Sequence, residues 1–191
     1  MATASDSYAA RRDIDYPETL DRFPTFFRLL WILPILIIAA LLTIDGLWFA
    51  TMLMIVFRVI YPRWWFDFAR ELARFVARVG AYAFLLTDGY PSTVDEQSVH
   101  LELDYPDVEN DLNRWLPLVK WLLAIPHYVV LVVLYVAAFF VWIIAWFAIL
   151  FTGVYPRGLF DFMVGVARWS LRVEAYAFLL ITDEYPPFSL Q

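Results

Sequence analysis

Charged residues recur at helical spacing in two segments of the chain. In residues 64–87, Asp67, Glu71, Arg74 and Arg78 fall at positions i, i+4, i+7 and i+11, which share one face of a helix. In residues 158–181 the equivalent face carries one glycine and three charged residues: Asp161, Gly165, Arg168 and Arg172. Two kinds of chemistry suit such a stripe, the binding of anionic lipid headgroups and the passage of ions. The structural alternative is that the arginines pair with Asp67 and Asp161.

Three further charged residues could act at or within a membrane. Arg63 and Arg157 each follow a Tyr-Pro pair, directly before a charged segment, and are the best candidates for contact with lipid headgroups. Asp45 lies inside a long apolar run, where a carboxylate is costly unless it has a partner. It is a candidate ion or proton site, or an inward partner for an arginine of the stripes. Alternatively, residues 44–46 form a kink or a loop.

Motifs of known catalytic chemistry are missing from the sequence. There is no cysteine, which excludes disulfides and thiolate chemistry, and no GxGxxG, P-loop or nucleophile-elbow pattern. His127 stands alone without the spacing of a metal site, so we expect an imidazole at the membrane interface, bonded to headgroups or to Trp121. The net charge of −6 argues against nucleic acid as a partner. We therefore expect neither an enzyme nor a bound cofactor or metal ion.

The elements that carry these residues belong to a membrane protein. Hydrophobic residues make up 62% of the 191 residues, more than a soluble protein of this size is able to bury. Residues 121–152 contain no formally charged side chain, and in residues 29–57 only Asp45 is charged. Both runs exceed the roughly 20 residues that cross a bilayer core as a helix. The sequence therefore predicts an all-α integral membrane protein.

The chain also contains two copies of one unit. The matched segments occur in the same order in both halves: Asp15-Tyr16-Pro17 with Asp104-Tyr105-Pro106, Pro34 with Pro126, Tyr61-Pro62-Arg63 with Tyr155-Pro156-Arg157, Phe66-Asp67-Phe68 with Phe160-Asp161-Phe162, and Ala81–Leu86 with Ala175–Leu180. Each copy closes on Thr-Asp-x-Tyr-Pro. Shared hydrophobicity alone does not produce so many ordered matches, so we interpret the chain as a tandem duplication.

These motifs resemble a bacterial membrane family catalogued as domain of unknown function 4389, which often occurs in tandem. The resemblance rests on the Asp-Tyr-Pro opening, the Trp-Leu-Leu-Ala-Ile-Pro-His-Tyr run at 121–128, Tyr-Pro-Arg-Gly-Leu-Phe-Asp-Phe at 155–162 and Arg-Val-Glu-Ala-Tyr-Ala-Phe-Leu-Leu at 172–180. It covers nearly the whole chain after residue 14, and the first copy departs from it where Pro34-Ile35 replaces Pro-His. The resemblance implies an architecture but no activity and no catalytic residues.

The expected organisation has four parts. Residues 1–14 form an N-terminal tail and residues 15–92 the first repeat, with helix A at about 26–60 and helix B at about 64–87. Residues 93–103 form an acidic linker with a short strand, and residues 104–191 the second repeat, with helix A at about 116–152 and helix B at about 158–181. Alternating residues at 99–105 predict the strand, and we expect residues 101–105 to pair with residues 12–16.

Whether helix B crosses the membrane depends on its charges. An amphipathic helix lying in the interface is the simpler interpretation, because a charge in the bilayer core costs about 2.5–3.5 kcal/mol to insert. However, two copies that sit the same way up need an even number of crossings each. We therefore expect a multi-pass protein of the bacterial cytoplasmic membrane with four embedded helices, in which A and B both cross.

The functional expectation follows from the missing catalytic motifs and the large apolar surface. We expect a non-catalytic membrane accessory or scaffolding subunit that contacts the lipid bilayer and packs against other membrane subunits or itself. The alternative is a small channel or transporter component in which Asp45 and the arginine stripes line a path.

Overall fold

The computed structural model describes residues 8–42, 46–93 and 97–191, so Asp45 lies outside the described residues. The elements follow in the order β1 (Ala10–Ile14), α1 (Arg22–Leu42), α2 (Gly46–Leu53), η1 (Met54–Arg58), α3 (Arg63–Ala83), β2 (Val99–Leu103), η2 (Leu116–Leu118), α4 (Lys120–Leu123), α5 (Ile125–Thr152) and α6 (Arg157–Ala177). The protein is mostly helical, and the short strands that the sequence predicted before the repeats form a two-stranded antiparallel sheet.

The two strands form the centre of the molecule. Strands β1 and β2 pair antiparallel, with Arg12 opposite Leu101 in the middle of the register. The expected strand pair is present, two residues earlier on each strand than the sequence suggested, and β1 takes up part of the segment expected to be a tail. Because side chains alternate across a strand, Arg12 and Leu101 point to one face, while Arg11, Asp13 and their partners point to the other.

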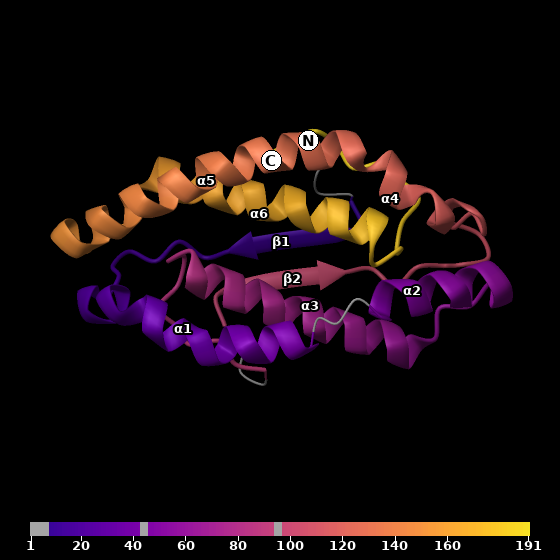
Figure 1. Cartoon of the computed structure of the whole chain (residues 1–191), viewed down its shortest axis with the longest axis horizontal. Coiled ribbons are helices and arrows are strands. Elements are labelled where there is room, and N and C mark those ends of the chain that lie inside the picture. Colours follow the sequence, from indigo (N-terminus) through magenta and orange to yellow (C-terminus); the bar gives the residue numbers. More distant parts are fainter. Residues whose placement is uncertain (1–7, 43–45, 94–96) are drawn as a thin grey trace.

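An approximate two-fold rotation relates the two copies. Helix α6 packs on β1, which precedes the first repeat, and α3 packs on β2, which precedes the second. Helix α1 packs on α3, and α5 packs on α6 (Figure 1). In Figure 1 the helices of the second copy run above the sheet and those of the first copy below it. Each copy therefore lends its opening strand to the helices of the other copy.

The Tyr-Pro-Arg turns have the same geometry in both copies. Pro62 and Pro156 precede α3 and α6 with nearly equal backbone angles, φ −57° and ψ 133° against φ −60° and ψ 124°. Each proline carbonyl accepts hydrogen bonds from amides of the first helical turn. Proline suits this position because its fixed φ starts a helix and the amide that it lacks has no helical partner there. The matching geometry confirms that the two turns are equivalent.

The expected long helices A are divided into shorter elements. In the first copy α1 ends at Leu42, and α2 and η1 follow from Gly46. In the second copy the short elements η2 and α4 precede α5, and Pro126 lies in the first turn of α5. In the described part of the chain, α5 is the one helix long and apolar enough to cross a membrane. The prediction that both helices A have this character is therefore corrected.

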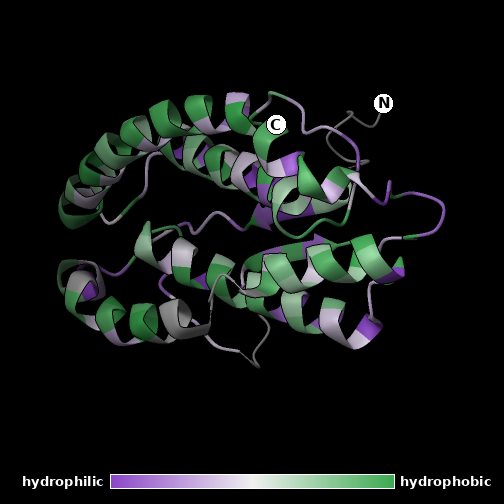
Figure 2. Cartoon of the chain, turned by 45° about the vertical axis from the view of Figure 1, so that its right-hand side comes forward, coloured by the Kyte–Doolittle hydropathy of each residue, from purple (hydrophilic) through white to green (hydrophobic). Residues whose placement is uncertain are grey.

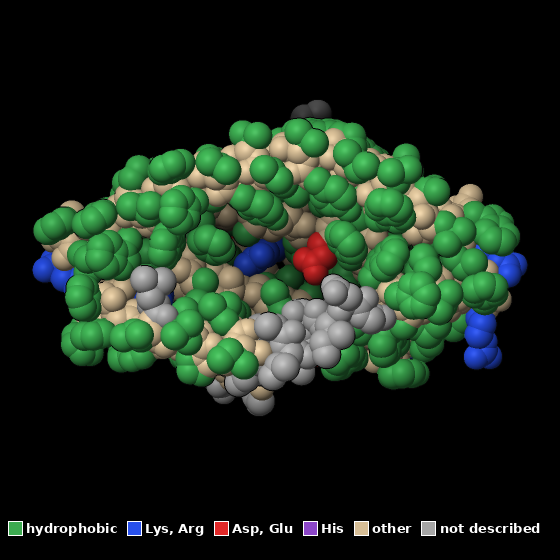
Figure 3. Space-filling model, viewed as in Figure 1, with side chains coloured by type: hydrophobic (Ala, Val, Ile, Leu, Met, Phe, Trp, Pro, Cys, Tyr) green, Lys and Arg blue, Asp and Glu red, His purple; other side chains and the backbone are tan. Residues whose placement is uncertain are grey.

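Apolar and polar residues lie on different sides of the molecule. Hydrophobic residues dominate α1 and α5, whereas hydrophilic residues concentrate near the strands (Figure 2). On the face seen in Figure 3, apolar side chains cover most of the surface around a central hollow. Along α5 the residues Val129, Val132, Val136, Phe140 and Phe151 are all more than half exposed. An uncovered apolar area of this extent indicates contact with lipid or with another protein.

Candidate functional site

The opening tyrosine of each copy is bound by the other copy. Its hydroxyl group donates a hydrogen bond to the backbone carbonyl of the tyrosine in the opposite Tyr-Pro-Arg turn. The guanidinium of Arg157 lies 4.5 Å from the ring centre of Tyr16, and that of Arg63 lies 4.6 Å from the ring centre of Tyr105. The two arginines expected to contact headgroups therefore hold the exchanged segments by cation–π contact.

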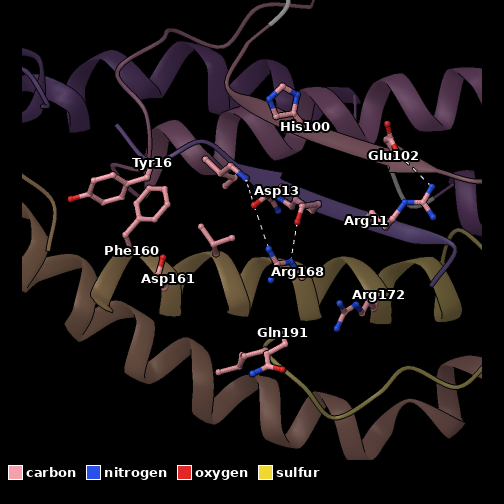
Figure 4. Close-up of a pocket in the computed structure, with 14 residues that line it drawn as sticks. Arg11, Asp13, Tyr16, His100, Glu102, Phe160, Asp161, Arg168, Arg172 and Gln191 are labelled. Carbon is pink, nitrogen blue, oxygen red and sulfur yellow. Dashed lines mark hydrogen bonds and ion pairs between the residues drawn. The ribbon is translucent and has the colours of Figure 1, made fainter. Parts of the chain in front are cut away.

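The central arginines of the two stripes bind the edges of the sheet. Arg74 Nε donates to the carbonyl of Leu101 on β2, and Arg168 Nε donates to the carbonyl of Arg12 on β1. Each of these hydrogen bonds is 3.0 Å long. Arg168 also lies 3.3 Å from Asp13 (Figure 4). These bonds occupy two carbonyls that a two-stranded sheet leaves unpaired at its outer edges.

The remaining stripe residues are used locally. Asp67 pairs with Arg63 at 3.6 Å and with Arg70 at 3.2 Å, within its own helix. Arg78 donates to the carbonyl of Ser92 at 2.6 Å, and Arg172 donates to that of Ser189 at 3.4 Å. The stripes thus hold strands and chain ends against α3 and α6.

A polar pocket of about 780 Å³ lies beside β1. It is lined by residues of both charges from β1, β2 and α6 (Figure 4), including Arg11, His100, Glu102, Asp161 and Arg168. Arg11 pairs there with Asp104 at 2.9 Å and with Glu102 at 3.5 Å. Asp161 is exposed at this pocket. Because the charges are mixed and mutually paired, the pocket resembles a solvated surface.

Two buried cations were not singled out from the sequence. Arg28 and Lys120 occupy equivalent positions of the repeat, and each pairs with the aspartate of a Thr-Asp-x-Tyr-Pro motif, Asp88 or Asp183. Lys120 Nζ lies 2.6 Å from Asp183, and both cations are almost completely buried. Each aspartate also accepts a backbone amide at the start of its copy. The signal that could have found them is a basic residue retained at one position of both copies.

An apolar cavity between α3 and α6 holds a second unexpected pair. The cavity has a volume of about 660 Å³ and is lined mainly by aliphatic and aromatic side chains. Its charged lining residues among those described are Arg12 and Glu174. Figure 3 shows basic and acidic side chains in the central hollow of the apolar face. Burial lowers the pKa of the Arg12 guanidinium to about 10, and burial raises the pKa of Glu174 more than the nearby Arg12 lowers it.

His127 is buried rather than interfacial. Its Nδ1 accepts a hydrogen bond from Trp169 Nε1 at 3.0 Å, not from Trp121, and its ring stacks on Phe188 at 4.0 Å. In the described part of the chain, no cluster of three or more His, Cys, Asp or Glu side chains is arranged to hold a metal ion. His127 therefore has a packing role between α5, α6 and the C-terminal segment.

The geometry defines a class of protein: a tandem duplication whose copies exchange strands and expose one apolar face. The family described as Domain of unknown function (DUF4389) matches residues 22–94 and 115–189, and the chain belongs to this family. The two matched segments correspond to the two copies, as the sequence motifs indicated. No curated protein and no solved structure matches the chain.

Proposed function

We propose that this protein is a non-catalytic membrane scaffold or accessory subunit of the bacterial cytoplasmic membrane. The observation that carries the proposal is the exposed apolar surface of α5, a helix of 28 residues without a formally charged side chain. Because an isolated soluble protein rarely exposes so large an apolar area, lipid or membrane subunits are expected to cover it.

The arrangement of layers favours one way of lying in the membrane. The apolar sides of α1 and α5 form one face, and the sheet with the exposed residues Asp13, His100 and Glu102 lies toward the other (Figures 2 and 3). If α3 and α6 crossed the bilayer, these polar side chains would lie at membrane depth, where they are costly. We therefore propose that the long axis lies in the membrane plane, with the apolar face in lipid and α3 and α6 at the interface.

This placement also keeps both copies the same way up. The two-fold axis runs through the centre of the sheet, between Arg12 and Leu101, so a face-down molecule presents equivalent sides of both copies to lipid. The sequence-based argument for four crossings required that both copies sit the same way up, and a molecule lying in the membrane plane also meets this requirement. The multi-pass arrangement stays a prediction. A measurement of membrane topology distinguishes it from the in-plane arrangement.

Membrane fractionation tests the proposal directly. The full chain is expected to remain in the membrane pellet after alkaline carbonate treatment and to leave it only in detergent. Copurification in mild detergent should then give a partner, or a second copy, at fixed stoichiometry. Detergent-free, monodisperse monomer from cells would overturn the scaffold proposal.

Single cysteines separate the two topologies, because the natural sequence contains none. Leu122→Cys and Thr152→Cys lie at exposed positions near the two ends of α5. An in-plane α5 predicts that an impermeant maleimide labels both from the same side of the membrane. Labelling from opposite sides would instead support a crossing and the multi-pass topology.

A further inference from the structure

We propose that the apolar cavity between α3 and α6 binds a neutral amphiphile, whose hydroxyl-bearing head lies between Arg12 and Glu174. The class comprises long-chain monoacylglycerols and similar single-headed lipids. This inference concerns binding and goes beyond the scaffold role; only the route of entry from the lipid phase rests on the proposed placement.

Size and lining match a lipid-like ligand. The volume of about 660 Å³ lies within the range of roughly 300–1,000 Å³ typical of small-molecule sites. The lining includes Trp48, Leu72, Val76, Met163 and Phe178, which suit a hydrocarbon chain. In Figure 3 the hollow opens through the apolar face, so a chain held by these residues reaches the same phase as the exposed side chains around it.

The head of the ligand is defined by two charged groups with unused bonding capacity. Arg12 Nη2 donates to the carbonyl of Ala77 at 2.9 Å, whereas its Nε is buried without a hydrogen-bond partner. Glu174 is an exposed residue of α6 that lines the cavity, so its carboxylate is open to a ligand there. No ion pair within 4.0 Å joins Arg12 and Glu174 among the described contacts. A donor and an acceptor thus face one cavity and leave room between them.

The repeat shows that this pair is specific to one half of the molecule. In the alignment of the copies, Leu101 stands at the position of Arg12, and Gly80 stands at the position of Glu174. Both departures from the duplicated pattern therefore line the same cavity. Arg12 and Glu174 line the same apolar cavity without direct contact, and a charge among apolar side chains is stabilised by a polar partner, which favours a third group between them.

The charge balance selects a neutral head. A carboxylate or phosphate head would be repelled by Glu174, and an ammonium head would be repelled by Arg12. A hydroxyl group accepts from the Arg12 guanidinium and donates to the Glu174 carboxylate at the same time. A neutral head also passes the apolar rim of the hollow at a lower desolvation cost than an ion.

Binding of 1-monoolein to the full chain in detergent, followed by native mass spectrometry, tests the inference. We expect one monoolein per chain, and weaker binding of oleate and oleylamine, which carry the same chain on charged heads. Glu174→Gln should weaken monoolein binding about tenfold, the scale of losing a hydrogen bond to a charged group. Asp161→Asn, on the same helix but outside this cavity, should bind as the natural protein does.

A second variant tests the position of the chain. Ala73→Trp fills the cavity and should abolish binding while the helical circular dichroism is retained; Val136→Trp, on the exposed side of α5, is the matched control. Equal monoolein affinity in Glu174→Gln, tighter binding of oleate or oleylamine, or no binding by the natural protein would each overturn the inference. Carbonate extraction of the natural protein and of the variants measures membrane embedding, so a failure of the binding inference is distinguished from a failure of the proposed placement.

Discussion

At the scale of single residues, the charged groups that lie among apolar side chains have two different roles. Lys120 and Arg28 are buried and tie the ends of each copy together through the aspartate of its closing motif. Arg12 and Glu174 instead face an apolar cavity without such a direct partner. The first arrangement predicts a large loss of stability when one partner is removed. The second arrangement predicts a gain of stability when the charge of Glu174 is removed.

Asp183→Ala should destabilise the folded protein by about 3–5 kcal/mol, because it leaves the Lys120 ammonium buried and unpaired. Asp161→Ala, an exposed aspartate of α6, should cost less than about 1 kcal/mol. Thermal unfolding in detergent compares the two variants. Adding Lys120→Met to Asp183→Ala should recover part of the loss, since no buried charge then remains. Equal losses for Asp161→Ala and Asp183→Ala would contradict this assignment.

Glu174→Gln should raise the melting temperature at neutral pH. Burial raises the folded-state pKa of Glu174 above its unfolded value, so its contribution to stability is fully present below the unfolded pKa and is lost as pH rises through the folded pKa. The glutamine does not titrate, so the advantage of the variant should shrink as the pH falls toward about 4. Melting curves across this range measure the difference. A variant that is less stable at pH 7 would show that the ionised carboxylate is needed for folding.

At the scale of elements, the C-terminal segment packs closely on α6. The C-terminal residues lie over α6, and the carbonyl oxygen of Leu190 would come within 2.8 Å of a Cβ atom added at Gly165. The equivalent position of α3 is Glu71, whose exposed carboxylate pairs with Arg74 at 2.7 Å. Glycine at 165 therefore permits a close contact between α6 and the C-terminal segment.

Gly165→Ala should displace the C-terminal segment and destabilise the protein by about 1–3 kcal/mol, as overpacking of a close contact does. The matched control is Gly158→Ala in the first turn of the same helix, where an added Cβ meets nothing within 4 Å. At position 158, the better helix propensity of alanine should stabilise the folded protein by up to about 1 kcal/mol. Thermal unfolding and limited proteolysis of the C-terminus report both effects. An undisturbed C-terminus in Gly165→Ala would disprove the close contact.

At the scale of the whole molecule, strand exchange makes the two copies mutually dependent. Strand β1 pairs with β2 but packs on α6, and Tyr16 binds the turn before α6. The first copy therefore supplies part of the packing that the second needs, and the reverse holds for β2 and α3. We therefore expect that neither copy folds independently in water.

Residues 1–93 and 94–191, expressed as two chains, should consequently copurify from membranes in detergent at a 1:1 ratio. Removing residues 1–16 from the first chain deletes β1 and Tyr16 and should abolish the association. Tandem affinity purification with a tag on each chain measures it. Association that persists without residues 1–16 would show that the helices alone hold the copies together.

The sequence by itself determined the duplication, the family, the equivalent Tyr-Pro-Arg turns and the strand pair, because each depends on local motifs or on their repetition. It also located the arginine stripes, since a helix fixes which residues share a face. Only the tertiary structure decided what the arginines bind, that β1 crosses to α6, and that Arg12 and Glu174 share a cavity. The physical reason is that these contacts join separate elements, in the case of Arg168 and Arg12 residues 156 positions apart, and helical or strand periodicity carries no information about such pairs.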